Sequence, residues 1–209
     1  MPVPHLQPGS ASLIIASPLS GKKELLYQYV SGCLKNKQPI IFISTDTSSE
    51  EIKKELLKNK IFYASQGNII KFIDCFSHQT GNIIPDKLDI KRVAGPLALN
   101  EISIAMAEIE REFLRKNKPA HTVIFDSLST VLMYSNPEMV GRFIQVLIAK
   151  VKNKAGSIIF TIEQGMHDEK TIITMEHLMD GIITLKKEKE KIMIKAQGIK
   201  GFEEWAEIK

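Results

Sequence analysis

Cysteine is scarce in this sequence, since Cys33 and Cys75 are the only two among 209 residues. Neither belongs to a CxxC or Cys/His pattern, which excludes the usual zinc sites and disulfide frameworks. Both have apolar neighbours, so we expect two buried, reduced thiols. Reduced thiols are typical of the cytoplasm, and we expect the protein to be cytoplasmic.

Long hydrophobic runs are also missing, because no stretch approaches the roughly 20 apolar residues that a membrane-spanning helix needs. The first eight residues, MPVPHLQP, lack a basic region followed by an apolar run, so we expect neither a targeting signal nor a membrane partner. Internal repeats and low-complexity linkers are absent as well. We therefore expect residues 1–209 to form a single domain.

The chain has no concentrated block of basic residues either. Its net charge of +4 arises from 28 basic and 24 acidic residues, and the surplus is scattered along the sequence. Scattered lysines keep a fold hydrated, whereas a nucleic-acid site gathers basic side chains on one surface. We therefore do not expect a nucleic-acid partner.

The sequence does contain a repeated alternation of strand and helix patterns. Short apolar runs rich in β-branched residues predict strands that are buried on both faces of a parallel sheet. These runs are residues 13–16, 40–44, 69–76, 122–125 and 157–162. Helical spacing of apolar residues predicts the intervening helices. These helical segments are residues 25–34, 100–115 and 136–152.

The last part of the chain has a different pattern. Residues 181–185 and 191–196 are two short strand-like segments joined by a charged run, and they predict an antiparallel hairpin at one sheet edge. The predicted fold class is therefore α/β, with a mainly parallel central sheet, helices on both faces and an antiparallel C-terminal hairpin.

The segment between the first predicted strand and the first helix is ASPLSGKK, residues 16–23. It stands where P-loop proteins carry GxxxxGKS or GxxxxGKT, in which backbone N–H groups, a helix N-terminus and a lysine bind phosphates. Gly21 and Lys22 fit this pattern. Ala16 replaces its first glycine, and Lys23 replaces the hydroxyl residue that coordinates Mg²⁺ and places a second ammonium there. The alternative is an ordinary strand-to-helix turn that contains glycine.

Further segments occur in the same order as in the RecA/KaiC-like branch of P-loop ATPases, and nearly the whole chain resembles archaeal KaiC-like proteins. The run TVIFDSLS, residues 122–129, is similar to the Walker B strand of that family, which implies that Asp126 orients Mg²⁺ or its water. A helix-capping aspartate is the alternative. The segment DTSSEEI, residues 46–52, is similar to the one that carries paired catalytic glutamates. The match implies Asp46 as a general base and leaves Thr47 in the second place.

Two other segments extend the resemblance. Gln164 follows the fifth strand and is similar to the glutamine that senses the γ-phosphate, although a polar loop start would look the same. The segment KAQG, residues 195–198, is similar to a lysine-x-arginine-glycine segment that reaches the ATP of a neighbouring subunit. Gln197 stands where the arginine would be. An arginine finger accelerates hydrolysis by roughly 10³ to 10⁵, so its replacement argues against fast hydrolysis.

The resemblance implies a KaiC-like domain with impaired or absent ATPase activity, which acts as a regulatory or interaction subunit. We expect ATP to bind weakly, Mg²⁺ to bind poorly, and the chain to form oligomers with itself or with another RecA/KaiC-like protein. Asp46 and Gln164 are the catalytic candidates, and Asp126 is the metal candidate. The nucleotide-binding candidates are Ser17, Pro18, Leu19, Ser20, Gly21, Lys22, Lys23 and Asp126. The alternatives are an active ATPase that assembles on DNA and a purely structural subunit without ligand.

Overall fold

The computed structural model describes residues 3–61, 69–81 and 84–208. Its strands are β1 (Ala11–Ala16), β2 (Ile40–Ser44), β3 (Ile70–Asp74), β4 (Ile90–Arg92), β5 (Thr122–Asp126), β6 (Ser157–Glu163), β7 (Gly181–Glu188), β8 (Lys191–Gln197) and β9 (Ala206–Ile208). Its helices are α1 (Lys22–Lys35), α2 (Ser49–Lys58), α3 (Leu99–Arg115), α4 (Leu128–Tyr134), α5 (Pro137–Lys152) and α6 (Glu169–Glu176), with a short 3₁₀ helix, η2 (Ser77–Thr80). Within these described ranges, no helix is both long and apolar enough to cross a membrane.

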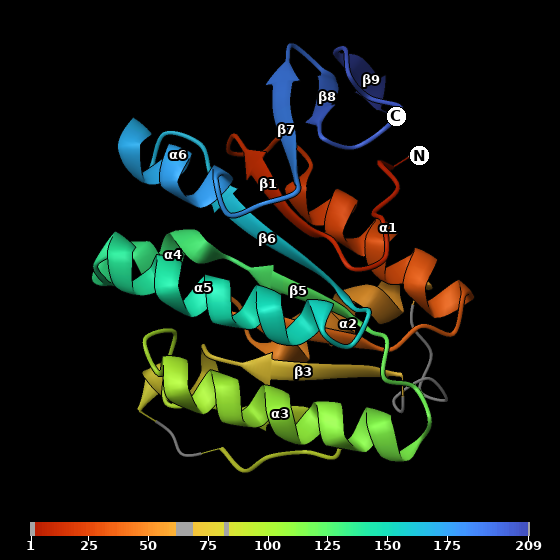
Figure 1. Ribbon diagram of the computed structural model, residues 1–209, viewed down its shortest axis with the longest axis vertical. Helices are drawn as coiled ribbons and strands as arrows, with labels where there is room; N and C mark the ends of the chain where they lie inside the picture. Colours follow the sequence, from red (N-terminus) through yellow and green to blue (C-terminus); the bar gives the residue numbers. More distant parts are fainter. Residues whose placement is uncertain (1–2, 62–68, 82–83, 209) are drawn as a thin grey trace.

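The strands form one nine-stranded sheet in the order β4-β3-β2-β5-β6-β1-β7-β8-β9. All pairings from β4 to β7 are parallel, whereas β8 runs antiparallel to both β7 and β9. The predicted fold class is confirmed (Figure 1). The hairpin does not form the sheet edge, however, because β9 pairs with its outer strand. Neither β4 nor β9 was predicted, since three residues are too few to show a strand pattern.

Helices cover both faces of the sheet. On one face, α1 and α2 bury their apolar sides against the strands, and on the other face α3, α4 and α5 do the same (Figure 1). Strands β1, β2 and β3 are buried along their whole length, as expected for parallel strands between two helical layers. Cys33 and Cys75 are buried free thiols, which confirms the expectation from their apolar neighbours.

Several helices begin close to the carboxyl ends of the parallel strands. Gly21 is the N-cap of α1 and has φ 82°, a left-handed conformation that glycine adopts without strain. A Cβ at this position would lie 2.6 Å from Cδ1 of Ile192 in the hairpin, so any other residue would be strained by the backbone conformation and would also displace the end of that side chain. Ser48 and Ser127 cap α2 and α4 by accepting N–H bonds from Glu51 and Ser129. These caps fix the chain around the carboxyl ends of β1, β2 and β5.

Candidate functional site

A cluster of one lysine and two carboxylates lies at the carboxyl ends of the central strands. Lys22, the first residue of α1, donates from Nζ to Oδ1 of Asp126 at 2.8 Å and to Oε1 of Glu163 at 2.6 Å. Asp126 ends β5 and Glu163 ends β6, and neighbouring parallel strands end at the same sheet edge. Ligands of open α/β folds bind in the crevice at this edge. The structure thus brings together Lys22 and Asp126, which the sequence pointed to, and adds Glu163.

Both carboxyl-bearing residues are held in place by neighbouring hydroxyl groups. Thr161 donates from Oγ1 to Oδ1 of Asp126 at 2.6 Å, so this oxygen accepts two hydrogen bonds. The backbone N–H of Glu163 donates to Oγ of Ser129, in α4, at 2.7 Å. The cluster is therefore a preorganised network and not a chance surface contact.

The charges in the cluster influence one another. Burial opposes the charged form of Lys22, but Asp126 and Glu163 outweigh it and raise the pKa of the ammonium, which stays charged at neutral pH. Asp46 is exposed, but protein atoms crowd its carboxyl group, and this partial desolvation and then the negative charge of Asp126 raise its pKa, while Lys22 opposes the shift. Asp46 follows β2 and accepts a hydrogen bond from Oγ1 of Thr47 at 3.2 Å. A carboxylate with a raised pKa has the character that a general base requires.

The loop before Lys22 leaves a polar group without a partner. Ser17 donates its N–H to the carbonyl of Leu185 at 3.2 Å, and Ser20 donates its N–H to the carbonyl of Ser17 at 3.2 Å. Pro18 and Leu19 lie exposed at the loop apex, where Leu19 adopts φ 58°. The hydroxyl of Ser20 is buried and has no hydrogen-bond partner among the described residues. An unpaired buried hydroxyl is costly, so Ser20 is a polar group of this loop that would be stabilised by a hydrogen-bond partner.

Lys23 points away from the cluster. Its Nζ donates to Oε1 of Glu55, in α2, at 2.6 Å, and the same carboxylate accepts a hydrogen bond from Tyr27. The expectation that Lys23 places a second ammonium at the metal position is therefore wrong, because its long side chain reaches α2 instead. The position still lacks the hydroxyl that would coordinate Mg²⁺.

Gln164 and Gln197, two other predicted site residues, make no hydrogen bond with the ammonium of Lys22 within the described ranges. Gln164 is exposed, and its backbone N–H donates to the carbonyl of Ala16 at 2.9 Å. It is the neighbouring Glu163, and not Gln164, that contacts Lys22. Gln197 is exposed at the end of β8, where it pairs with β7.

The residues present fit a phosphate group better than they fit Mg²⁺. The site offers three kinds of hydrogen-bond donor, namely the ammonium of Lys22, the N–H groups in the first turn of α1, which has no side-chain cap, and the unpaired hydroxyl of Ser20. Magnesium needs oxygen ligands in near-octahedral geometry. No group of three or more His, Cys, Asp or Glu side chains within the described ranges is arranged to hold a metal ion.

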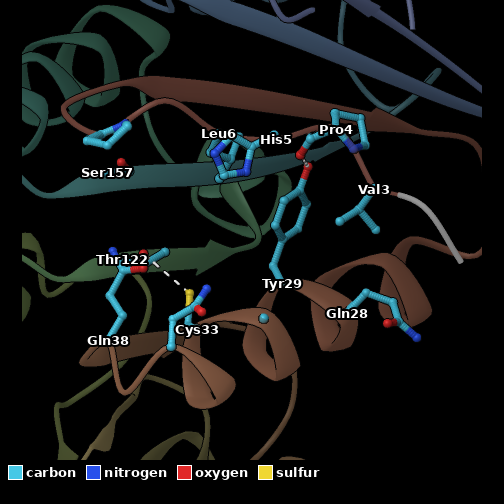
Figure 2. A pocket seen from close by; sticks show the side chains of 13 residues that line it. Val3, Pro4, His5, Leu6, Gln28, Tyr29, Cys33, Gln38, Thr122 and Ser157 are labelled. Carbon is cyan, nitrogen blue, oxygen red and sulfur yellow. Dashed lines mark hydrogen bonds between the residues drawn. The ribbon is translucent and has the colours of Figure 1, made fainter. Parts of the chain in front are cut away.

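A separate hollow of about 190 Å³ lies at the amino ends of the central strands, opposite the Lys22 cluster (Figure 2). Its lining includes Thr122 and Ser157, the first residues of β5 and β6, and Tyr29 and Cys33 of α1. The hydroxyl of Tyr29 donates to the carbonyl of Pro4 at 2.8 Å and ties the N-terminal segment to α1. Because this hollow lies at the amino ends of the strands, it is not part of the Lys22 cluster.

Solved structures define the class to which this fold belongs. The fold is similar to the KaiC-like protein PH0186 from the hyperthermophilic archaeon Pyrococcus horikoshii OT3, with a TM-score of 0.66 and 13% identity over 97% of this chain and 86% of that chain. It is also similar to the uncharacterized protein PH0321 from Pyrococcus horikoshii, solved in complex with an unknown peptide, with a TM-score of 0.72 and 16% identity over 92% and 84% of the two chains. The protein thus has a KaiC/RecA-like fold.

Family membership follows from the sequence. Residues 9–185 match the model of a family described as "Family of unknown function (DUF7504)", and the chain belongs to this family. No curated protein matches the sequence.

Proposed function

We propose that this protein is a nucleotide-binding subunit of KaiC-like type, which binds ATP through Lys22 but hydrolyses it very slowly or not at all. The observation that carries the proposal is the position of the Lys22 ammonium at the carboxyl edge of the sheet, between Asp126 and Glu163. This is the place where an open α/β sheet binds its ligand.

Three kinds of donor support phosphate binding. The ammonium of Lys22 supplies a full positive charge, and the N-terminus of α1 adds unpaired N–H groups and the positive end of the helix dipole. The buried hydroxyl of Ser20 gains a partner when a phosphate oxygen enters the loop. Bound phosphate must take the place of Glu163 on Lys22, which is consistent with weak binding.

The same site is poorly equipped for hydrolysis. Lys23 supplies no hydroxyl for Mg²⁺, and its side chain is committed to Glu55. Thr47 stands where the resemblance calls for a second carboxylate, which leaves Asp46 alone as a base. Gln197 carries no charge that would stabilise the transition state in a neighbouring subunit. Metal coordination, water activation and charge stabilisation are thus each weakened.

A domain that binds nucleotide without turning it over acts through what it contacts. We therefore propose a regulatory or interaction role, in oligomers of this chain or with another KaiC-like protein, in the cytoplasm. The peptide in the PH0321 complex is consistent with a protein partner for this fold.

Thermal unfolding with and without ATP tests the proposal. A ligand at 100 times its Kd adds roughly 2.7 kcal/mol of stability, which raises the Tm of a domain of this size by about 5 to 10 °C. We expect this rise for the wild type and not for Lys22→Ala. Turnover should remain far below roughly 1 per second, the lower end for kinases. A higher turnover that Lys22→Ala abolishes would overturn the impaired activity, and an equal Tm rise in both proteins would overturn the site.

A further inference from the structure

An open groove with both apolar and polar side chains is lined by the start of α3 and by α5. These two helices cover the same face of the sheet (Figure 1). Its volume is about 690 Å³. Leu97, Met139 and Val146 line it with exposed fractions of 48%, 52% and 51%. Single exposed apolar side chains are ordinary, but several that line one groove mark an interaction site.

The apolar residues of α5 form two stripes. One stripe, with Val140, Ile144 and Leu147, is buried in the core. The second consists of Met139, Phe143 and Val146, which lie at positions i, i+4 and i+7 and line the groove. A surface helix needs only one apolar stripe to pack on its sheet. Phe143 also packs against Phe125 of the core, but Met139 and Val146 remain about half exposed, so folding does not account for these two apolar side chains.

The free charges of the groove are positive. Arg142 and Lys150 line it from α5, and their side chains have no ion-pair partner in the part of the chain that the structure describes. Glu101 is the acidic residue of the lining, and its Oε2 already accepts the N–H of Ala94 at 2.8 Å. An occupant with negative charges beside apolar anchors would thus be complementary.

We propose that this groove binds an amphipathic helical segment of a partner protein, with apolar residues at i, i+4 and i+7 flanked by aspartate or glutamate. From Met139 to Lys150 the wall of α5 extends about 16 Å, at 1.5 Å per residue, which matches about three turns of a docked helix. Two copies of this chain that met through the same groove would bring the positive charges of Arg142 and Lys150 in one copy close to those of the other. Such like-charge contacts disfavour a symmetric dimer. The proposal does not depend on nucleotide binding at Lys22.

Two synthetic helical peptides of about 15 residues test the proposal by fluorescence anisotropy. Both carry leucine at i, i+4 and i+7, and the flanking positions are glutamate in one and lysine in the other. We expect the glutamate peptide to bind with a Kd in the micromolar range, and the lysine peptide at least roughly tenfold more weakly. Val146→Glu should abolish binding, and Arg142→Glu with Lys150→Glu should reverse the preference. Ile173→Ser, at a side chain 55% exposed on α6, is the matched control and should change nothing.

Three results would overturn the proposal. The first is equal binding of the two peptides, or binding of neither. The second is undiminished binding by Val146→Glu, whose folded state is verified by an unchanged melting curve. The third is a wild-type dimer in sedimentation velocity that Val146→Glu converts to monomer, because this would assign the groove to a second copy.

Discussion

Replacing Glu163 with glutamine is expected to strengthen ATP binding. In the wild type, Oε1 of Glu163 holds the ammonium of Lys22 at 2.6 Å, and the two side chains are 23% and 17% exposed. A phosphate that binds Lys22 must replace this contact. Glutamine has a similar size but no charge, so its contact with the Lys22 ammonium is weaker and it does not repel the triphosphate.

The magnitude follows from the strength of the lost contact. A hydrogen bond between charged groups contributes about 1.5 to 3 kcal/mol to stability. If ATP binding to the wild type must break a contact at the lower end of this range, removing the charge makes the free energy of ATP binding about 1.5 kcal/mol more favourable, which is roughly tenfold in affinity. Asp126 still pairs with Lys22 in the variant, so the lysine remains in place.

Calorimetric titration of ATP into wild type and Glu163→Gln measures this difference. The matched control is Glu188→Gln, because Glu188 also pairs with a lysine at 2.6 Å but is 56% exposed on the hairpin. The control should bind ATP as the wild type does. Equal or weaker binding by Glu163→Gln would refute the idea that Glu163 competes with phosphate for Lys22.

Three further predictions concern other parts of the molecule. The buried carboxylate of Glu110 accepts a hydrogen bond from Nζ of Lys154 at 2.9 Å and lies 3.2 Å from Nε2 of His121. Burial opposes the charge of Glu110, but these two neighbours lower its pKa. The stability that the carboxylate contributes is therefore present at neutral pH and is lost as the pH falls through the folded pKa. Glu110→Gln should lower the free energy of unfolding by about 2 kcal/mol at pH 7 in urea denaturation, and a difference that does not shrink at acid pH would contradict this. Lys23→Thr should make ATP binding stronger with Mg²⁺ than without it in calorimetry, whereas identical affinities would argue against the loop assignment. Cys33 is 9% exposed and lies in the hollow that the N-terminal segment helps to line. Tyr29→Phe removes the hydrogen bond that ties this segment to α1, so it should increase severalfold the rate at which a thiol reagent modifies Cys33. An unchanged rate would show that the segment does not protect the thiol.

The sequence predicted most of the sheet and two of the three members of the ion-pair cluster. Buried strands in a parallel sheet produce continuous apolar runs, so the five central strands were recognisable. The resemblance implied Lys22 and Asp126 as members of one nucleotide site, and both lie near the carboxyl ends of parallel strands. The structure joins them directly at 2.8 Å.

Glu163 was missed because the fifth strand was ended one residue too early. The structure continues β6 to Glu163. Side chains alternate along a strand, so Thr161 and Glu163 lie on the same side, where they contact Asp126 and Lys22. Extending the strand by one residue would have favoured Glu163 over Gln164.

Other features depend on tertiary packing that the sequence does not reveal. The direction of Lys23 is set by the position of Glu55 in α2. Phe143 packs against Phe125 of the core, yet it is only partly buried and also lines the groove. Helical spacing identifies apolar stripes, but it does not show which stripe is covered.

Isothermal titration of ATP into wild type and Lys22→Ala tests the central claim most directly, because one trace reports binding as a transient heat pulse and hydrolysis as a sustained heat signal. The account predicts saturable pulses for the wild type, at least roughly tenfold weaker binding for Lys22→Ala, and no sustained signal from either protein. Equal affinities in the two proteins, or sustained heat that disappears with Lys22, would contradict it.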